Sequence, residues 1–354
     1  MFTSKLASVI DDFVTELFPN QARSVMALAL GKFPKQPFTD LRMEKLRRDW
    51  FELLPDPVSA AVIPSRQPFL LHALSQSAKL MGDPDWQILD QGEYCFAKGV
   101  RLGVGCALPR TPAVFRQKTK QRKYNESTFK ADMANYQSAE VAGPALRKQF
   151  LEEQKLGMMT ELRLADAKKR FPGNQLRIAA QGAIAKSADE WRILHDGTNG
   201  VLCDPEIEVK DQLEFAGPGD IAATMELSKL EKPGVHFAIA ADVWHAHRLV
   251  LHAEQDWGLM ACRDGTDPES IWINHIGTFG FASIAYWWAR LIGLAGRFAG
   301  RLTADAWLLV FADGLHLVAG GETKWKVILR VIVALLMPGA PFKWSKFRGG
   351  VELD

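Results

Sequence analysis

The sequence predicts an α+β protein. Short runs typical of β-strands, such as VHFAIAADV and the neighbouring pair WLLVFAD and LHLVA, are interleaved with helical segments that begin near 281 and near 322. The chain has 354 residues and is 47% hydrophobic, which is ample for a buried core and suggests two or three sub-domains. Its net charge of +2 excludes a polycation, so any nucleic-acid surface must come from local clusters of lysine and arginine.

Cysteine usage and hydropathy exclude several other classes. The four cysteines lack CxxC spacing and are expected to be free thiols in a reducing compartment: Cys95, Cys106, Cys203 and Cys262. Two apolar stretches imitate membrane segments, but arginines interrupt both, and about 18 or more uncharged apolar residues are needed to span a bilayer. We therefore expect buried helices in a soluble, intracellular protein with no membrane partner.

Residues 1–140 form a region of unknown role that we expect to be mostly helical. Helix-like segments near 4–18, 41–54 and 66–80 are separated by prolines. The stretch RTPAVFRQKTKQRKY, which begins at Arg110, then combines lysines and arginines with Phe115 and Tyr124. Such a strip can bind a phosphate backbone and stack on bases, but taken alone a solvated loop or helix face is the slightly favoured interpretation.

Residues 141–232 contain two helices and a hairpin in our prediction. The segment 145–171 is typical of two helices that are hinged at Gly157. The β-like runs LRIAA and WRILH then flank the polar loop KSADE, which predicts a hairpin with Lys186 and Arg192 on its two sides.

Residues 233–354 carry the sharpest pattern. A buried strand ends in Asp242, and a short strand, a glycine-bounded loop and a long helix from about 281 follow. The run VFADGLHLVAGG then predicts a hairpin in which Asp313 and Gly314 form a type I′ turn, with positive φ at Gly314. A helix over 322–337 stops at a Pro-Gly pair, and PFKWSKFRGG begins another strand-like run.

This order of elements places two carboxylates from distant parts of the chain at adjacent strand ends. Asp242 and Asp313 together suit Mg²⁺, or Mn²⁺, because these ions accept one or two carboxylates plus substrate phosphates. Two metal ions held in this way activate an attacking hydroxyl and stabilise a leaving pyrophosphate. The alternative is simpler: Asp242 caps a strand end and Asp313 is only a turn residue.

Five blocks of the sequence, in this order, resemble the palm and fingers of reverse transcriptases, closest to those of DIRS-like retroelements and of dinoflagellate retroelement proteins. The blocks are GAIAKSADEWRILHDGT, ADVWHAHRLVLHAEQDWGLMAC, GTFGFASIAYWWARL, FADGLHLVAGG and PFKWSKFRGG. The resemblance covers about 150–350. It implies a right-hand polymerase palm, an antiparallel sheet backed by helices, over 233–354, with fingers over 141–232 and no thumb.

The resemblance also implies roles for single residues. Asp242 and Asp313 would be the catalytic metal ligands, and Lys346, or alternatively Lys343, would lie near the departing pyrophosphate. Nucleotide contacts would come from the remaining family positions, which are Lys186, Arg192, His247 and Gly280. The activity implied is RNA-directed DNA polymerisation, with a primer–template and nucleoside triphosphates as partners.

Three departures from the family pattern favour a second hypothesis. Gly314 stands where the family hairpin has a second acid, and His247 stands where an aromatic residue excludes the 2′-hydroxyl. The sequence also stops before the family's thumb. These features suggest a fragment or a partial copy, and a catalytically inactive retroelement remnant that keeps the palm fold and weak nucleic-acid binding is the alternative function.

Two further patterns are weaker. His245, His247 and His252 include common zinc ligands, but no fourth ligand has a suitable spacing. His195 and Asp196 suggest a general-base pair, yet neighbouring residues of a strand point to opposite faces.

Overall fold

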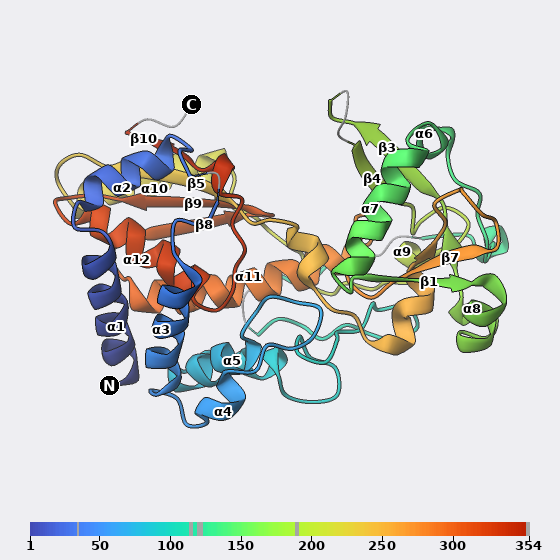
Figure 1. Cartoon of the computed structure of the whole chain (residues 1–354), viewed down its shortest axis with the longest axis horizontal. Coiled ribbons are helices and arrows are strands. Elements are labelled where there is room, and N and C mark those ends of the chain that lie inside the picture. Colours follow the sequence, from blue (N-terminus) through green and yellow to red (C-terminus); the bar gives the residue numbers. More distant parts are fainter. Residues whose placement is uncertain (34, 113–115, 119–122, 188–190, 352–354) are drawn as a thin grey trace. The chain divides into compact units, whose positions relative to one another are not determined.

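The computed structural model describes residues 1–33, 35–112, 116–118, 123–187 and 191–351, and it divides the chain into two compact units (Figure 1). Unit 1 comprises Met1–Gln91, Glu214–Ala246 and Ala289–Asp354, and unit 2 comprises Gly92–Leu213 and His247–Trp288. Both units are discontinuous in sequence, unlike the consecutive segments 1–140, 141–232 and 233–354 of the sequence analysis. The fold is α+β, as predicted.

Unit 1 is built on a four-stranded antiparallel sheet with the strand order β10-β5-β9-β8. The strands are β5 (Phe237–Asp242), β8 (Trp307–Phe311), β9 (Gly314–Ala319) and β10 (Arg348–Gly350). Helix α11 (Ala282–Leu302), which crosses the unit boundary, comes between β5 and β8, and α12 (Lys324–Leu336) comes between β9 and β10. This βαββαβ order, with the first and third strands in the centre, is the split βαβ arrangement.

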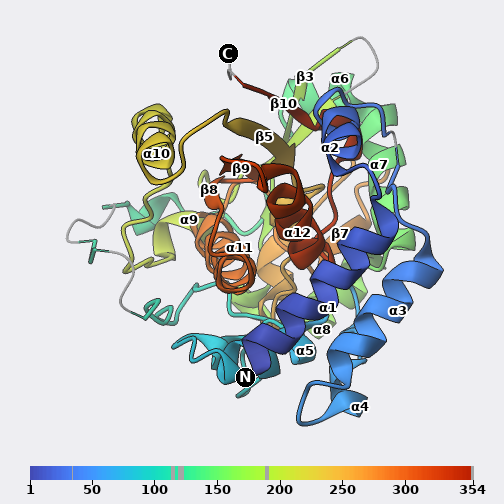
Figure 2. The ribbon, with the colours of Figure 1, turned by 90° about the vertical axis from the view of Figure 1, so that its left-hand side faces the viewer.

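One face of this sheet is buried under α11 and α12. Residues that pair directly across a sheet point to the same side, so Ile239, Leu317 and Leu308 share a face. A Cβ on Gly296 of α11 would lie 3.8 Å from Leu308 on that face. Phe237 contacts Trp325 of α12 there, with 5.0 Å between ring centroids. Figure 2 shows both helices on this side of the sheet and α10 (Pro218–Glu231) on the other side.

The N-terminal part of unit 1 consists of helices, the first two of which pack against α12. The helices are α1 (Phe2–Leu17), α2 (Gln21–Ala29), α3 (Asp40–Phe51), α4 (Pro57–Ala60), α5 (Leu71–Leu80) and the 3₁₀ turn η1 (Trp86–Leu89). Asp11 of α1 forms ion pairs with Lys326 and Arg330 of α12. The helices predicted near 4–18 and 41–54 are confirmed. The third begins at Leu71 instead of 66, because Pro68 disfavours helical geometry in the residue before it.

Three arginines of α11 form ion pairs with buried aspartates. Arg290 forms a two-pronged ion pair with Asp85, and Arg297 and Arg301 both pair with Asp83. Both aspartates lie between α5 and η1 and are buried in unit 1. Over the described ranges, the structure has no helix that combines the length and hydrophobicity needed to cross a bilayer.

Unit 2 contains a second four-stranded sheet with the order β1-β7-β6-β2, in which only the β6–β2 pair is parallel. Its strands are β1 (Met159–Arg163), β2 (Ile178–Ala179), β6 (Ala261–Cys262) and β7 (Ser270–Asn274), and β3 (Gln181–Ala185) and β4 (Trp191–His195) form a separate hairpin. The helices are α6 (Gln137–Val141), α7 (Gly143–Lys155), α8 (Leu164–Arg170) and α9 (Cys203–Glu206). The 3₁₀ turns of the chain beyond η1 are η2 (Glu126–Thr128), η3 (Gly173–Gln175), η4 (Ala246–Leu249), η5 (Glu254–Met260) and η6 (Trp344–Lys346).

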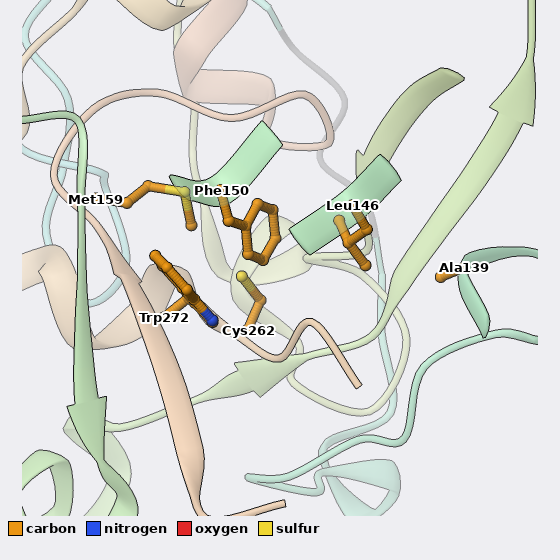
Figure 3. Close-up of a cluster of buried hydrophobic side chains, with 6 residues drawn as sticks. All are labelled: Ala139, Leu146, Phe150, Met159, Cys262 and Trp272. Carbon is orange, nitrogen blue, oxygen red and sulfur yellow. The ribbon is translucent and has the colours of Figure 1, made fainter. Parts of the chain in front are cut away.

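Apolar side chains from α6, α7 and three strands form a core cluster in unit 2. Phe150 lies against Trp272, with 5.3 Å between ring centroids, and Leu146, Met159, Cys262 and Ala139 complete the cluster (Figure 3). Burial raises the pKa of the Cys262 thiol, so this cysteine behaves as a small apolar residue. All four cysteines are free thiols, as predicted.

Two predictions for unit 2 are corrected. The segment 145–171 contains two helices, as predicted, but they are not hinged at Gly157: α7 ends before Gly157, whose φ is +73°, and the strand β1 separates it from the short helix α8. MTELR is helical by propensity, but pairing with β7 over five residues overrides that preference. The predicted hairpin exists, but its first strand is QGAIA instead of LRIAA.

The Asp85–Arg290 pair should dominate the attachment of α11 in unit 1. We expect Asp85→Ala to lower the free energy of unfolding by about 3–5 kcal/mol, because it leaves a buried guanidinium unpaired. Urea denaturation measures the change. Lys45→Ala, which removes the exposed Lys45–Glu16 pair, is the control and should cost no more than about 1 kcal/mol. Equal losses in the two variants would contradict this view of α11.

Candidate functional site

The pairing of β5 with β9 brings the two predicted metal ligands together. Asp242 is the last residue of β5 and lies opposite Gly314, the first residue of β9. The backbone amide of Val243 donates a hydrogen bond of 2.9 Å to the carbonyl oxygen of Asp313. Asp242 and Asp313 therefore lie at the same end of two neighbouring strands, as the order of the sequence motifs predicted.

The turn of the β8–β9 hairpin differs from the prediction. Ala312 and Asp313 form its two-residue loop, and Gly314 already belongs to the ladder, paired with both Asp242 and Phe311. The positive φ, +51°, falls on Ala312 and not on Gly314. A non-glycine residue with such a φ stores strain of about 1–3 kcal/mol, and such strain clusters at functional sites. The exposed carboxylate-bearing residue Asp313 directly follows this strained position.

Lys346 is the third charged residue of this site. Its Nζ lies 2.8 Å from Oδ2 of Asp242, and both side chains are partly exposed. Lys343, the sequence alternative, contributes its backbone amide instead, which donates a hydrogen bond of 2.8 Å to the Asp242 carbonyl oxygen. The turn η6 places both lysines directly before β10, the other neighbour of β5. The structure thus favours Lys346 over Lys343 as the side chain that reaches Asp242.

The acidic site opens on the sheet face that α11 and α12 leave uncovered. Side chains alternate along a strand, so Asp242 and Ala240 point away from the face that carries Ile239. Gly314 and His316 of β9 lie directly opposite these two residues and share their face. A side chain at position 314 would therefore stand beside Asp242. His316 is a residue that sequence reasoning missed, although the alternation in LHLVA places it on this face once the pairing is known.

The other four predicted site residues belong to unit 2. Arg192 lies on the exposed face of the β3–β4 hairpin, opposite the exposed Ile184. Lys186 is exposed and directly follows β3. The rest of the predicted loop, 188–190, lies outside the described residues.

Gly280 and His247 lie close to the base of this hairpin. Gly280 has a φ of +124°, and a Cβ there would stand 1.9 Å from the carbonyl oxygen of His195 at the end of β4. The amide of His195 donates a hydrogen bond of 3.2 Å to the carbonyl oxygen of Phe279. The rings of His247 and Phe279 are in edge contact, 5.2 Å apart. The close approach that requires glycine at 280 is therefore made by the protein's own backbone.

His195 does not form a general-base pair with Asp196. Burial lowers the pKa of His195 to about 3, so its ring is neutral at pH 7, and Nδ1 lies 3.1 Å from the Gln181 amide nitrogen. Asp196 instead receives hydrogen bonds from Tyr136 and Asn199. Both observations agree with the argument from strand alternation.

The basic strip that begins at Arg110 is anchored to the segment before α10. Arg110 forms a 2.7 Å ion pair with the fully buried carboxylate of Asp211. The amide of Lys118 donates a hydrogen bond to the carbonyl oxygen of Lys210. Arg116 and Lys118 are exposed. Residues 113–115 and 119–122, which include Phe115, lie outside the described residues.

The donor set at Asp242 and Asp313 fits a hard divalent cation better than zinc. Mg²⁺ takes carboxylate oxygens and completes its shell with water and phosphate oxygens, so two carboxylates suffice. The Asp242 carboxylate already pairs with the ammonium group of Lys346, which a metal ion would have to share or displace. Among the residues that the structure describes, no group of three or more His, Cys, Asp or Glu side chains gathers as a metal site. A zinc site built from His245, His247 and His252 thus gains no support.

Comparisons with known proteins do not assign the chain to a family. None of the protein-family models matches the sequence, and no curated protein matches it. The functional argument therefore rests on the residues and on the geometry described above.

The backbone contact at Gly280 predicts a folding defect. We expect Gly280→Ala to lower the stability of unit 2 by at least about 1–3 kcal/mol, the cost of the strained φ alone, because the Cβ also collides with the His195 carbonyl. Thermal unfolding measures it. Gly143→Ala, which meets open space without a positive φ, is the matched control and should change little. A stable Gly280→Ala variant would show that this backbone contact is not required.

Proposed function

We propose that unit 1 is a polymerase palm and that the protein carries out template-directed nucleotidyl transfer of the reverse-transcriptase type. The observation that supports this proposal most is the position of Asp242 and Asp313 at one end of a split βαβ sheet, beside Lys346. The order of the five sequence blocks supports it independently. The proposed partners are an RNA or RNA–DNA primer–template and nucleoside triphosphates.

The residues of unit 1 act in this proposal mainly by charge and position. Asp242 and Asp313 hold Mg²⁺, or Mn²⁺, and when bound the metal supplies activation of the primer 3′-hydroxyl and neutralisation of the phosphates. Lys346 places an ammonium group next to Asp242, where it donates a hydrogen bond to the departing pyrophosphate. Phosphoryl transfer needs little else, because positioning and electrostatic stabilisation supply most of its catalysis.

The residues of unit 2 bind the incoming nucleotide in this proposal. Lys186 and Arg192 contact the triphosphate from their hairpin, for which the planar fork of arginine is well suited. His247 borders the sugar, and the edge contact with Phe279 fixes the plane of its ring. Gly280 keeps its own segment in place against the end of β4.

Gly314 favours a second candidate function, a palm that binds nucleic acid without catalysis. The missing carboxylate removes one negative charge next to Asp242 and weakens cation binding. No positive φ opposes a side chain here, but a Cβ at 314 would lie 3.3 Å from the carbonyl oxygen of Phe311, so the backbone of β8 must shift by a few tenths of an ångström. Adding the acid therefore tests the site at the cost of a small adjustment of the hairpin.

The first test is primer extension with Mg²⁺. We expect Asp242→Asn and Asp313→Asn to lower the extension rate at least about 100-fold, because each removes a charge that stabilises the transition state. Gly314→Asp should raise the rate and lower the Mg²⁺ concentration needed for half-maximal activity. Asp305→Asn, which alters an exposed acid of the same unit, is the control and should extend primer normally.

The two candidate functions predict different outcomes. A silent wild type together with an active Gly314→Asp variant would identify a sound fold with a decayed site. If neither protein extends primer or binds a hybrid duplex, both candidate functions are wrong. Wild-type extension that persists in Asp313→Asn would disprove the role of the acid pair.

The two lysines provide a second test. We expect Lys346→Ala to lower the extension rate by about 100-fold, since it removes the ammonium group beside Asp242. Lys343→Ala keeps the backbone hydrogen bond to Asp242 and should retain most activity. Single-turnover extension rates measure both effects. Equal losses in the two variants would contradict the assignment of Lys346.

A further inference from the structure

His316 lies on the same sheet face as the acidic site. It is the third residue of β9 and pairs with Ala240 of β5 and Leu309 of β8, two positions along the strand from the Asp242–Gly314 pair. Residues two apart on a strand point to the same side, so the imidazole and the Asp242 carboxylate share the face that α11 and α12 leave uncovered, part of which α10 covers. None of the sequence blocks drew attention to this residue.

The imidazole of His316 is directed toward the space that Gly314 leaves open. Its Nε2 lies 3.9 Å from the position that a Cβ at residue 314 would occupy, which is ordinary van der Waals distance. The other ring nitrogen, Nδ1, is buried and has no hydrogen-bond partner among the described residues. An orphaned buried N–H is rarer than an orphaned acceptor, so Nδ1 is assigned as the unprotonated nitrogen and Nε2 carries the N–H. The ring then presents an N–H donor beside Asp242.

His316 lies in the last partly exposed row of this sheet face. Ala240, His316 and Leu309 form a partly exposed row across the sheet, whereas Ala238 and Val318 in the next row are buried. The uncovered part of the face therefore runs from the acidic end of the strands to His316 and stops there. A ligand that lies against Asp242 and continues along this face meets the imidazole next.

We propose that His316 is a substrate-contacting residue whose Nε2–H donates a hydrogen bond to a phosphate oxygen of the primer-terminal nucleotide. This inference rests on the proposed function, because it needs a primer on the uncovered face. A phosphodiester is the matching chemistry, since about half or more of the hydrogen bonds between proteins and nucleic acids go to phosphate and sugar. The second carboxylate of the family pattern, at position 314, would repel phosphate. The imidazole of His316 is directed toward that space and offers phosphate a hydrogen-bond donor instead.

Binding of a primer–template with a chain-terminated primer tests this role. We expect His316→Leu to raise the Kd about tenfold, the effect of one lost hydrogen bond to a charged phosphate oxygen. His316→Gln keeps an N–H donor on a side chain of similar reach and should restore most of the affinity. His72→Leu, a partly buried histidine elsewhere in unit 1, is the control and should bind like the wild type.

The outcomes separate this inference from the proposed function. A wild type that binds the primer–template while His316→Leu binds equally well overturns the role of His316 and leaves the proposed function intact. Loss of affinity in both His316→Leu and His316→Gln, with a lowered melting temperature, also overturns it, because it indicates a structural role. A wild type that binds no primer–template overturns the proposed function and this inference together.

A double-mutant cycle gives an independent test. A carboxylate at position 314 would come within reach of Nε2. The new acid would then occupy the space beside the imidazole and interact with the same N–H that is proposed to bind phosphate. We therefore expect Gly314→Asp to change primer-extension rate and Mg²⁺ dependence by different factors in the wild-type and His316→Gln backgrounds. Additive effects would show that the two positions act independently, and this result would overturn the proposal that His316 faces the site.

Discussion

The antiparallel pairing of β5 with β9 is the constraint on which the candidate site depends. Six residue pairs fix the register from Phe237–Ala319 to Asp242–Gly314. Burial sets this register, because Ile239 and Leu317 must face the helices. A slip by one residue would move every side chain of a strand to the other face and would bury Asp242 under α11 and α12. The position of the acids thus follows from the apolar residues of the sheet and not from any attraction between carboxylates.

Burial of apolar residues also explains why α11 combines a membrane-like composition with three arginines. Its apolar residues cover the sheet of unit 1, and Arg290, Arg297 and Arg301 find carboxylates in the short segment around Asp83 and Asp85. A buried charge is tolerated only when it is paired and hydrogen-bonded. The ion pairs therefore select one orientation of the helix, which in turn fixes how β8 follows it into the sheet. Helix α11 therefore connects the ion pairs of its three arginines with the hairpin that carries Asp313.

Sequence reasoning was most successful where structure is set locally. The hairpin of β8 and β9, the strand that ends at Asp242 and the helix before Pro338 all follow from alternation, turn residues and helix stops. It failed where contacts between residues distant in sequence determine the local structure. The strand β1 exists because β7 pairs with it, and the close carbonyl oxygen of His195 requires glycine at 280. The positive φ at Ala312 was missed because a two-residue Asp-Gly turn is the commoner solution. His316 was missed because its face depends on the pairing with β5.

Gly314 separates the requirements of the fold from those of the chemistry. The hairpin does not use glycine's conformational freedom here, since Ala312 takes the left-handed conformation, and a Cβ at 314 would make one tight contact, 3.3 Å from the Phe311 carbonyl oxygen. The glycine therefore acts on the site alone: it leaves two acids, one lysine paired with Asp242, and an imidazole directed toward the gap. The second carboxylate of the family pattern would have added a charge that favours cations and repels phosphate. On the proposed function, Lys346 and a metal ion would share Asp242, and the loss of the second acid would shift the balance toward nucleic acid at the expense of metal. An active enzyme with this site would then need a higher concentration of Mg²⁺, and an inactive one would still hold its primer–template.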